Sequence, residues 1–245
     1  MTQAAAPLCL LTRPRDDAER FAVKVRQRFG VKSIVSPLLK IVPIRPALNL
    51  ADFDVVILTS VQAARQLSDL EIPKTVTCFA VGRSTADTAR GLGFQAHDAQ
   101  GDVEALFELV RSVSPKGNLI HLRGEHSRGR LAERLTEAGL PCEETVVYQQ
   151  IAQALSTTAI EALAGDTIVV LPLFSPRTAR ILAGTSVSFR STYGVAMSAA
   201  VADELTSLSI MDMRIATAPN QAAMLEAMGE LEPIRSLLER RSMQS

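Results

Sequence analysis

The sequence predicts an α/β protein of two similar domains, with parallel sheets flanked by helices, joined by a two-stranded β connector. Short apolar runs alternate with amphipathic stretches along most of the chain, which is typical of strand–helix units and of parallel sheets. Two extended stretches interrupt this alternation, and one part of the chain repeats the pattern of another. The 245 residues are enough for two domains of about 120 residues each.

The individual elements follow from the period of the apolar residues. In the first amphipathic stretch, Phe21, Val25 and Phe29 recur at a spacing of four, and Gly30 favours a helix end. Strands are expected at 8–11, 54–58, 77–81, 118–122, 167–171 and around Val195. Amphipathic segments, which favour helices, are expected at 16–29, 61–70, 85–92, 103–113, 131–138, 160–163, 176–182, 199–205 and 222–228.

The domain boundaries are predicted from the two extended stretches, 36–46 and 143–152, neither of which is followed by a helical pattern. They bracket an uninterrupted set of strand–helix units, and two extended segments in such positions can pair as a connector. The sequence therefore predicts one domain from residues 1–37 plus 152–245 and a second from 47–142, with connector strands at 38–46 and 143–151.

An internal duplication is the third observation. Residues 54–67 and 167–182 both show a strand, then a serine, then a helix. Ser60 and Gly82 are 22 positions apart, as are Ser175 and Met197. Any two strand–helix units look alike, but equal spacing over two consecutive units favours a repeat.

Composition excludes several classes of function. Lys plus Arg and Asp plus Glu each number 26, whereas binding to nucleic acid through bulk charge needs a basic excess. The three cysteines are scattered, with no CxxC pair, so neither a disulfide framework nor a zinc site is expected and a reducing, cytoplasmic location fits best. The three histidines lack ligand spacing, which predicts no metal site. No signal peptide or membrane span is recognised.

Candidate anion-binding residues lie where predicted strands lead into helices. In open parallel sheets, ligands bind beyond the carboxyl ends of the strands. Unpaired N–H groups and the positive helix end there suit a carboxylate or a phosphate. The candidates at these turns are Ser60, Gly82, Ser84, Thr85 and Ser175. The alternative is that the hydroxyls only cap helices, and both interpretations stay open.

Arginines supply a second set of candidates. Arg13 directly follows the first predicted strand, where it could face a ligand or lie on the surface beside Pro14. The segment 123–130 contains Arg123, Arg128 and Arg130 with two glycines, which suits either anion binding or a solvated charge run. Walker, GxGxxG and GxSxG motifs are absent from the corresponding turns.

Taken in order, six segments resemble the uroporphyrinogen-III synthase family: 10–14 (LLTRP), 54–60 (DVVILTS), 81–86 (VGRSTA), 122–125 (LRGE) with Arg128, 146–148 (VVY) and 174–176 (FSP). The resemblance implies two α/β domains, a connecting two-stranded ladder and an active site in the cleft between them. It implies a monomeric, cofactor-free enzyme that cyclises hydroxymethylbilane, a linear tetrapyrrole, with loss of water and inversion of the last pyrrole ring. It also implies a transient contact with hydroxymethylbilane synthase.

The same resemblance implies residue roles. Tyr148 resembles the family's tyrosine, proposed to assist loss of the hydroxyl, although from the residues alone a half-buried packing role is the default. Thr85 resembles a cleft threonine, and Ser60 and Ser175 resemble turn serines that meet substrate carboxylates. In the second repeat, the expected hydroxyl falls on Ala200, and Ser198 partly replaces it.

The departure in the second repeat keeps an alternative function open. A catalytically altered relative could act as a two-domain binding protein for a polyanionic small molecule. A response-regulator-like interaction module is disfavoured, because no acidic phosphorylation cluster stands at the predicted strand ends.

Overall fold

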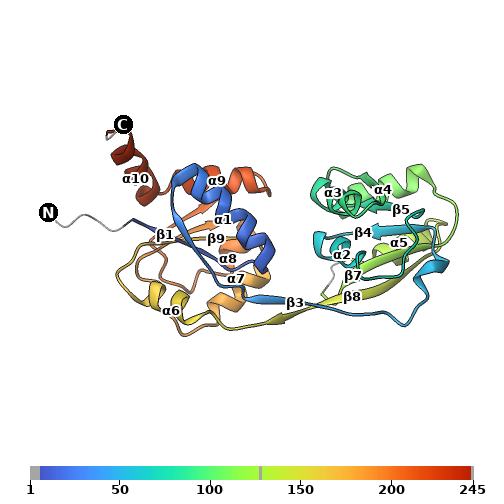
Figure 1. Cartoon of the computed structure of the whole chain (residues 1–245), viewed down its shortest axis with the longest axis horizontal. Coiled ribbons are helices and arrows are strands. Elements are labelled where there is room, and N and C mark those ends of the chain that lie inside the picture. Colours follow the sequence, from blue (N-terminus) through green and yellow to red (C-terminus); the bar gives the residue numbers. More distant parts are fainter. Residues whose placement is uncertain (1–5, 127–128, 244–245) are drawn as a thin grey trace. The chain divides into compact units, whose positions relative to one another are not determined.

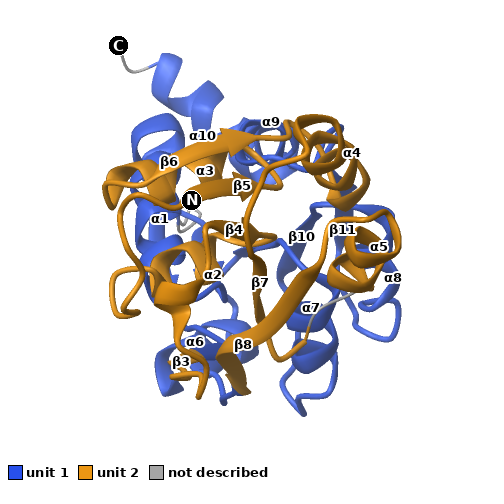
Figure 2. Cartoon of the chain, turned by 90° about the vertical axis from the view of Figure 1, so that its right-hand side faces the viewer, with its two compact units in different colours: residues 1–40, 152–245 blue, residues 41–151 orange. Residues whose placement is uncertain are grey.

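A computed structural model describes residues 6–126 and 129–243. The chain divides into two compact units, unit 1 from Met1–Lys40 with Ala152–Ser245 and unit 2 from Ile41–Ile151; Figure 2 colours them blue and orange. Each unit contains one sheet with helices on both of its faces (Figure 1). The predicted fold class is therefore confirmed.

The sheet of unit 1 has the strand order β11-β10-β9-β1-β2, and every adjacent pair is parallel. Its strands are β1 (Leu8–Leu11), β2 (Lys32–Val35), β9 (Val169–Leu173), β10 (Thr192–Ala196) and β11 (Asp212–Ile215). Its helices are α1 (Arg15–Phe29), α6 (Thr157–Ala164), α7 (Pro176–Ala183), α8 (Ala199–Asp203), α9 (Gln221–Gly229) and α10 (Glu232–Ser242).

Alternate residues of β1 explain why helices cover both faces of this sheet. Cys9 and Leu11 pack with the apolar residues of α1, α9 and α10, whereas Leu10 packs with those of α6, α7 and α8. Successive strand residues point to opposite faces. A strand buried on both faces therefore requires a continuous apolar run, as the sequence has here.

Unit 2 has the strand order β3-β8-β7-β4-β5-β6, and the pairs from β8 to β6 are parallel. Its strands are β3 (Leu39–Pro43), β4 (Val55–Leu58), β5 (Thr77–Ala80), β6 (Gln95–Asp98), β7 (Leu119–Gly124) and β8 (Cys142–Ala152). Its helices are η1 (Leu50–Asp52), α2 (Val61–Gln66), α3 (Arg83–Gly91), α4 (Val103–Val113) and α5 (Leu131–Glu137). One face packs with α2 and α3 and the other with α4 and α5.

The two predicted extended stretches form β3 and β8, which are neighbours in the sheet of unit 2. The Ile44 N–H donates to Val147 O at 2.9 Å, and the Gln153 N–H donates to Leu38 O at 3.0 Å. The chain passes from one unit to the other after Lys40 and again after Ile151. Both passages therefore fall within or at the end of these paired strands.

The two sheets share one topology in a permuted order. In unit 2, β4, β5 and β6 run outward from the centre, and β7 and β8 lie on the other side of β4. In unit 1, β9, β10 and β11 run outward in the same way, and β1 and β2, from the start of the chain, take the places of β7 and β8. The order thus reverses between β4 and β7 and between β9 and β1, the kind of position where open α/β sheets bind ligands.

Several elements differ from the sequence-based prediction. Helix α2 ends at Gln66 instead of Leu70, because Leu67 and Asp69 bond three residues back in a tight turn. Strand β9 begins and ends two residues later than expected, because its pairing with β10 runs from Val169 to Leu173 and includes Pro172. The prediction omitted β2, β6 and β11, which lie at sheet edges and combine polar with apolar residues, and it omitted α10.

Candidate functional site

Ser60 begins helix α2 at the carboxyl end of β4, the central strand of unit 2. Its backbone is extended (φ −154°, ψ 151°), and its Oγ accepts a hydrogen bond from the Ala63 N–H at 3.1 Å. This is helix capping by a serine side chain. The cap fixes the position of the Ser60 hydroxyl, which also has a second partner.

That partner is Tyr148 of β8, whose hydroxyl lies 3.1 Å from Ser60 Oγ. The side chain is 6% exposed and packs in the core beneath α2 and α3. Burial raises the pKa of the Tyr148 phenol above its usual value, and the hydrogen bond between Tyr148 and Ser60 partly opposes this rise. The result is a phenol held in its protonated form, with its oxygen placed at the first turn of α2.

The bulge between β7 and β8 determines where the Tyr148 ring lies. Arg123 pairs with Val146, but the next residue, Gly124, pairs with Tyr148. A Cβ at Gly124 would lie 2.5 Å from Tyr148 Cζ and 2.7 Å from its hydroxyl oxygen. The ring therefore rests directly on the glycine backbone.

Helix α3 begins with a second hydroxyl-bearing turn of unit 2. Gly82 is its N-terminal cap residue, has an extended backbone, and supplies no side-chain cap. Ser84 is exposed in the first turn, and the Thr85 side chain is buried at 4% exposure. No side chain caps the first-turn N–H groups of α3, whereas the Ser60 side chain caps α2.

Arg123 lies on the face of β7 opposite to the face that packs against Tyr148. Its guanidinium donates to Glu144 Oε1 at 3.0 and 2.7 Å. His121, two residues earlier and on the same face, is 2% exposed, and its Nε2 lies 3.0 Å from Thr59 Oγ1. The structure therefore places Arg123 in an ion pair with Glu144, on the opposite face from Tyr148.

In the described structure, one of the two ring nitrogens of buried His121 makes a hydrogen bond and the other does not. Its Nδ1 makes no hydrogen bond in the described structure and lies 3.8 Å from Glu144 Oε2. Burial lowers the pKa of His121 to about 4; Glu144 opposes this change and Arg123 adds to it. No local pattern in the sequence indicates that His121 contacts Thr59, the residue before Ser60.

Where the structure describes the segment 123–130, its other charged residues pair with close neighbours along the chain. Arg128 lies outside the described residues. Arg130 forms an ion pair with Glu133 one turn later. His126 lies beside Glu125, with 3.8 Å between Nε2 and Oε2.

Unit 1 repeats the serine turn at the end of β9. Ser175 has nearly the same backbone as Ser60 (φ −151°, ψ 146°), and its Oγ accepts from the Thr178 N–H at 3.2 Å. Its Oγ also lies 2.8 Å from the Thr178 hydroxyl. Arg13, which follows β1, has its guanidinium carbon 4.0 Å from the centre of the Phe174 ring. The structure therefore brings Arg13 to the turn that holds Ser175.

The spacing of the duplication has to be corrected by one residue. Helix α8 begins after Ser198, whose extended backbone (φ −158°, ψ 167°) matches that of Gly82 (φ −161°, ψ 168°). Ser198, and not Met197, is therefore the equivalent of Gly82, because the second repeat is one residue longer. The position equivalent to Thr85 is then Val201, 1% exposed, and not Ala200, which is exposed. The hydroxyl is absent at either position.

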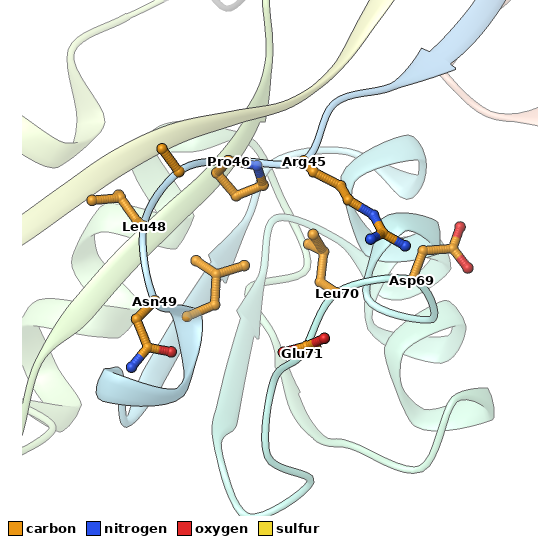
Figure 3. A pocket seen from close by; sticks show the side chains of 9 residues that line it. Arg45, Pro46, Leu48, Asn49, Asp69, Leu70 and Glu71 are labelled. Atoms are coloured by element: carbon orange, nitrogen blue, oxygen red, sulfur yellow. The ribbon is translucent and has the colours of Figure 1, made fainter.

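Unit 2 also has a hollow of about 320 Å³, and Figure 3 shows the side chains that line it. Its lining comes from the segment that precedes β4, including Arg45 and Asn49, and from Asp69 to Glu71 before β5. These segments lead into the amino ends of the strands, whereas Ser60 and Gly82 follow the carboxyl ends. Ligands of open α/β sheets bind at the carboxyl ends, so the candidate sites are the serine turns of each unit, and not this hollow.

Two further observations limit the kinds of site. In the two described stretches of the chain, no three His, Cys, Asp or Glu side chains gather as ligands for a metal ion. None of the described helices combines the length and apolarity needed to cross a membrane.

The fold and its turns define a class: a protein of two related parallel α/β units, in which helix-capping serines and one buried tyrosine lie at the carboxyl edges of the sheets. The sequence profile described as uroporphyrinogen-III synthase HemD matches residues 19–226. The chain belongs to the uroporphyrinogen-III synthase family.

Solved structures show the same fold. Uroporphyrinogen-III synthetase from Helicobacter pylori is 18% identical, with a TM-score of 0.65 over 91% of this chain and 97% of that one. A mutant uroporphyrinogen III synthase from the extremely thermophilic bacterium Thermus thermophilus is 15% identical, with a TM-score of 0.52 over 96% and 100% of the two chains. No curated protein sequence matches the chain significantly.

Proposed function

We propose that this protein is a uroporphyrinogen-III synthase that acts in porphyrin and heme biosynthesis. It converts hydroxymethylbilane to uroporphyrinogen III, eliminating the terminal hydroxyl as water, inverting the last pyrrole ring and closing the macrocycle. The observation that carries the proposal is the Tyr148 phenol. It is buried at the carboxyl ends of the strands in the sheet of unit 2 and is hydrogen-bonded to Ser60. Membership in the family supplies the substrate class.

Tyr148 is proposed to donate a hydrogen bond or a proton to the departing hydroxyl. Its raised pKa keeps the phenol protonated at neutral pH, which is the state that a donor requires. A phenol is a weak acid, but loss of hydroxide from a pyrrolic carbinol is driven mainly by the electron-rich ring. A single well-positioned proton donor is therefore sufficient to assist loss of the hydroxyl.

The helix ends are proposed to bind substrate carboxylates. In unit 2 the groups are the first turn of α3, with Gly82, Ser84 and Thr85, and the neighbouring turn of Ser60. In unit 1 they are Ser175, Ser198 and Arg13. Helix N-termini favour anions through free N–H groups and the helix dipole. Arg123 is proposed to contribute less to carboxylate binding, because its guanidinium is paired with Glu144. A contribution of Arg128 to carboxylate binding stays a prediction.

The protein is also proposed to act in the cytoplasm. All three cysteines are free thiols, and Cys9 and Cys78 are buried among apolar side chains, which suits a reducing compartment. Action as a monomer, and a transient contact with hydroxymethylbilane synthase, stay predictions.

The test supplies hydroxymethylbilane to the purified protein and identifies the product isomer. Uroporphyrinogen III is expected, formed faster than spontaneous cyclisation. If only uroporphyrinogen I appears, at the spontaneous rate, the proposal that the protein is a synthase is refuted.

The role of Tyr148 is tested by Tyr148→Phe. Turnover is expected to fall about 100-fold or more, as for loss of a general acid, while stability changes by about 1 kcal/mol for one hydrogen bond. Tyr193→Phe is the matched control, because Tyr193 is the other tyrosine of the chain and is half-buried against the core of unit 1; it should keep full activity. Full activity in Tyr148→Phe would remove Tyr148 from the mechanism.

One observation favours a second candidate, a non-catalytic binding protein for a polyanionic small molecule. The hydroxyl of Thr85 has no counterpart in unit 1, where Val201 takes its place. The same product assay separates the two candidates, since a binding protein would leave the isomer ratio of the spontaneous reaction unchanged.

A further inference from the structure

We propose that Ser60 and Gly124 are positioning residues for Tyr148: Gly124 leaves the space that the ring occupies, and Ser60 holds and polarises the phenol oxygen. The catalytic consequence of this inference rests on the proposed function, but the positioning itself does not. Three features of unit 2 carry it.

The first feature is the bulge in β8. Val147 and Tyr148 are consecutive, yet both pack in the core beneath α2 and α3. A regular strand would send consecutive side chains to opposite faces. The register shift after Arg123 allows both to face the same core, and β-bulges redirect side chains in this way. The bulge therefore turns Tyr148 toward the start of α2.

The second feature is the glycine at this point of β7. A Cβ at Gly124 would meet Tyr148 Cζ at 2.5 Å, its hydroxyl oxygen at 2.7 Å and Cε2 at 2.8 Å. These are atoms of a rigid ring on a side chain that is only 6% exposed, so the ring or the strand would have to shift. A glycine inside a strand often marks such a close approach, and no larger residue leaves the ring where it lies.

The third feature is the difference between the two serine turns. Ser175 bonds a hydroxyl on its own helix, Thr178, three residues later. The residue three positions after Ser60 is Ala63, which offers only its N–H. The Ser60 hydroxyl is therefore available to Tyr148. With Ser60 as donor, the phenolic proton is left for a substrate oxygen.

The experiment titrates Tyr148 directly by tyrosinate absorbance. The chain has two tyrosines and no tryptophan, so the Tyr193→Phe protein reports Tyr148 alone. In that background, Ser60→Ala is expected to raise the pKa of Tyr148 by roughly half to one pH unit, the equivalent of one hydrogen bond. Turnover should fall by about threefold to tenfold. Ser60→Thr should restore both values.

Ser60→Ala also removes a helix cap, so a cap-loss control is needed. Ser156 caps α6 through the same contact, with Ala159 N–H to Ser156 Oγ at 3.3 Å, and it belongs to unit 1, whereas Tyr148 belongs to unit 2. Ser156→Ala should lower stability to a similar extent and leave the pKa of Tyr148 and the turnover unchanged.

Gly124→Ala is expected to displace the ring. The pKa of Tyr148 should fall toward that of an exposed tyrosine, and turnover should fall to the level of Tyr148→Phe. If the single variant does not fold, Gly124→Ala combined with Tyr148→Ala should fold, because the clash is removed. Failure of that double variant to fold would overturn the role of Gly124.

The outcomes separate this inference from the proposed function. An unchanged pKa of Tyr148 in Ser60→Ala, or in folded Gly124→Ala, overturns the corresponding positioning role even if the wild type makes uroporphyrinogen III. A wild type that makes only uroporphyrinogen I overturns the function, while the shifts in pKa would still establish the positioning.

Discussion

Stability of unit 2 is expected to depend on the charge of His121. This side chain is 2% exposed, its Nδ1 makes no hydrogen bond in the described structure, and burial lowers its pKa to about 4. The charged groups that face it are Glu144, which opposes that change, and Arg123, which adds to it. The folded state therefore favours the neutral form of the His121 imidazole.

The direction of the effect follows from proton binding. In the unfolded chain a histidine has a pKa near 6.5, so between about 4 and 6.5 the unfolded state binds more protons than the folded state. The contribution of His121 is fully present above about pH 6.5 and is lost as the pH falls toward 4. The difference between 6.5 and about 4, at about 1.36 kcal/mol per pKa unit, corresponds to roughly 3 kcal/mol in total and about 2 kcal/mol at pH 5.

The assay is urea unfolding followed by circular dichroism at pH 7.5 and pH 5.0, in the wild type and in His121→Gln. Carboxylates titrate in both proteins, so their contribution cancels in the comparison. The wild type should lose about 2 kcal/mol more than the variant on going to pH 5.0. His97→Gln is the matched control, because His97 lies exposed on β6 and should behave as the wild type.

Equal losses in the wild type and in His121→Gln would refute the reasoning. Such a result would mean that protonated His121 is accommodated in the fold, with Glu144 moving closer than the 3.8 Å observed.

Two further stability predictions concern single positions. Gly117 has φ +99°, and a Cβ there would meet the Asp54 carboxylate, so Gly117→Ala should destabilise the protein by roughly 1–3 kcal/mol; a urea midpoint within error of the wild type would contradict this. Val201→Thr should cost roughly 1–3 kcal/mol by burying a hydroxyl, whereas Ala200→Thr, on the exposed face of α8, should cost less than about 1 kcal/mol. Equal urea midpoints for these two variants would contradict the burial of Val201 in the core of unit 1.

The strand–helix alternation and the helix starts could be predicted from the amino-acid sequence. Ser60 and Ser175 cap α2 and α7 as their positions indicated, because a cap involves residues only three positions apart. Both predicted extended stretches became β3 and β8. Edge strands such as β6 and β11 were not predicted, because half-exposed strands need no continuous apolar run.

How the candidate residues combine is a property of the folded chain and could not be predicted. The hydrogen bond between Ser60 and Tyr148 joins residues 88 positions apart, and no local pattern encodes it. Arg123 appeared equivalent to the other candidates in sequence, yet the alternation of β7 sends it to Glu144 on the opposite face. Equal spacing suggested that Met197 is the counterpart of Gly82, but the capping geometry gives Ser198. Spacing along the chain records how many residues separate two turns, whereas the strand register and the bulge opposite Gly124 fix which side chains meet.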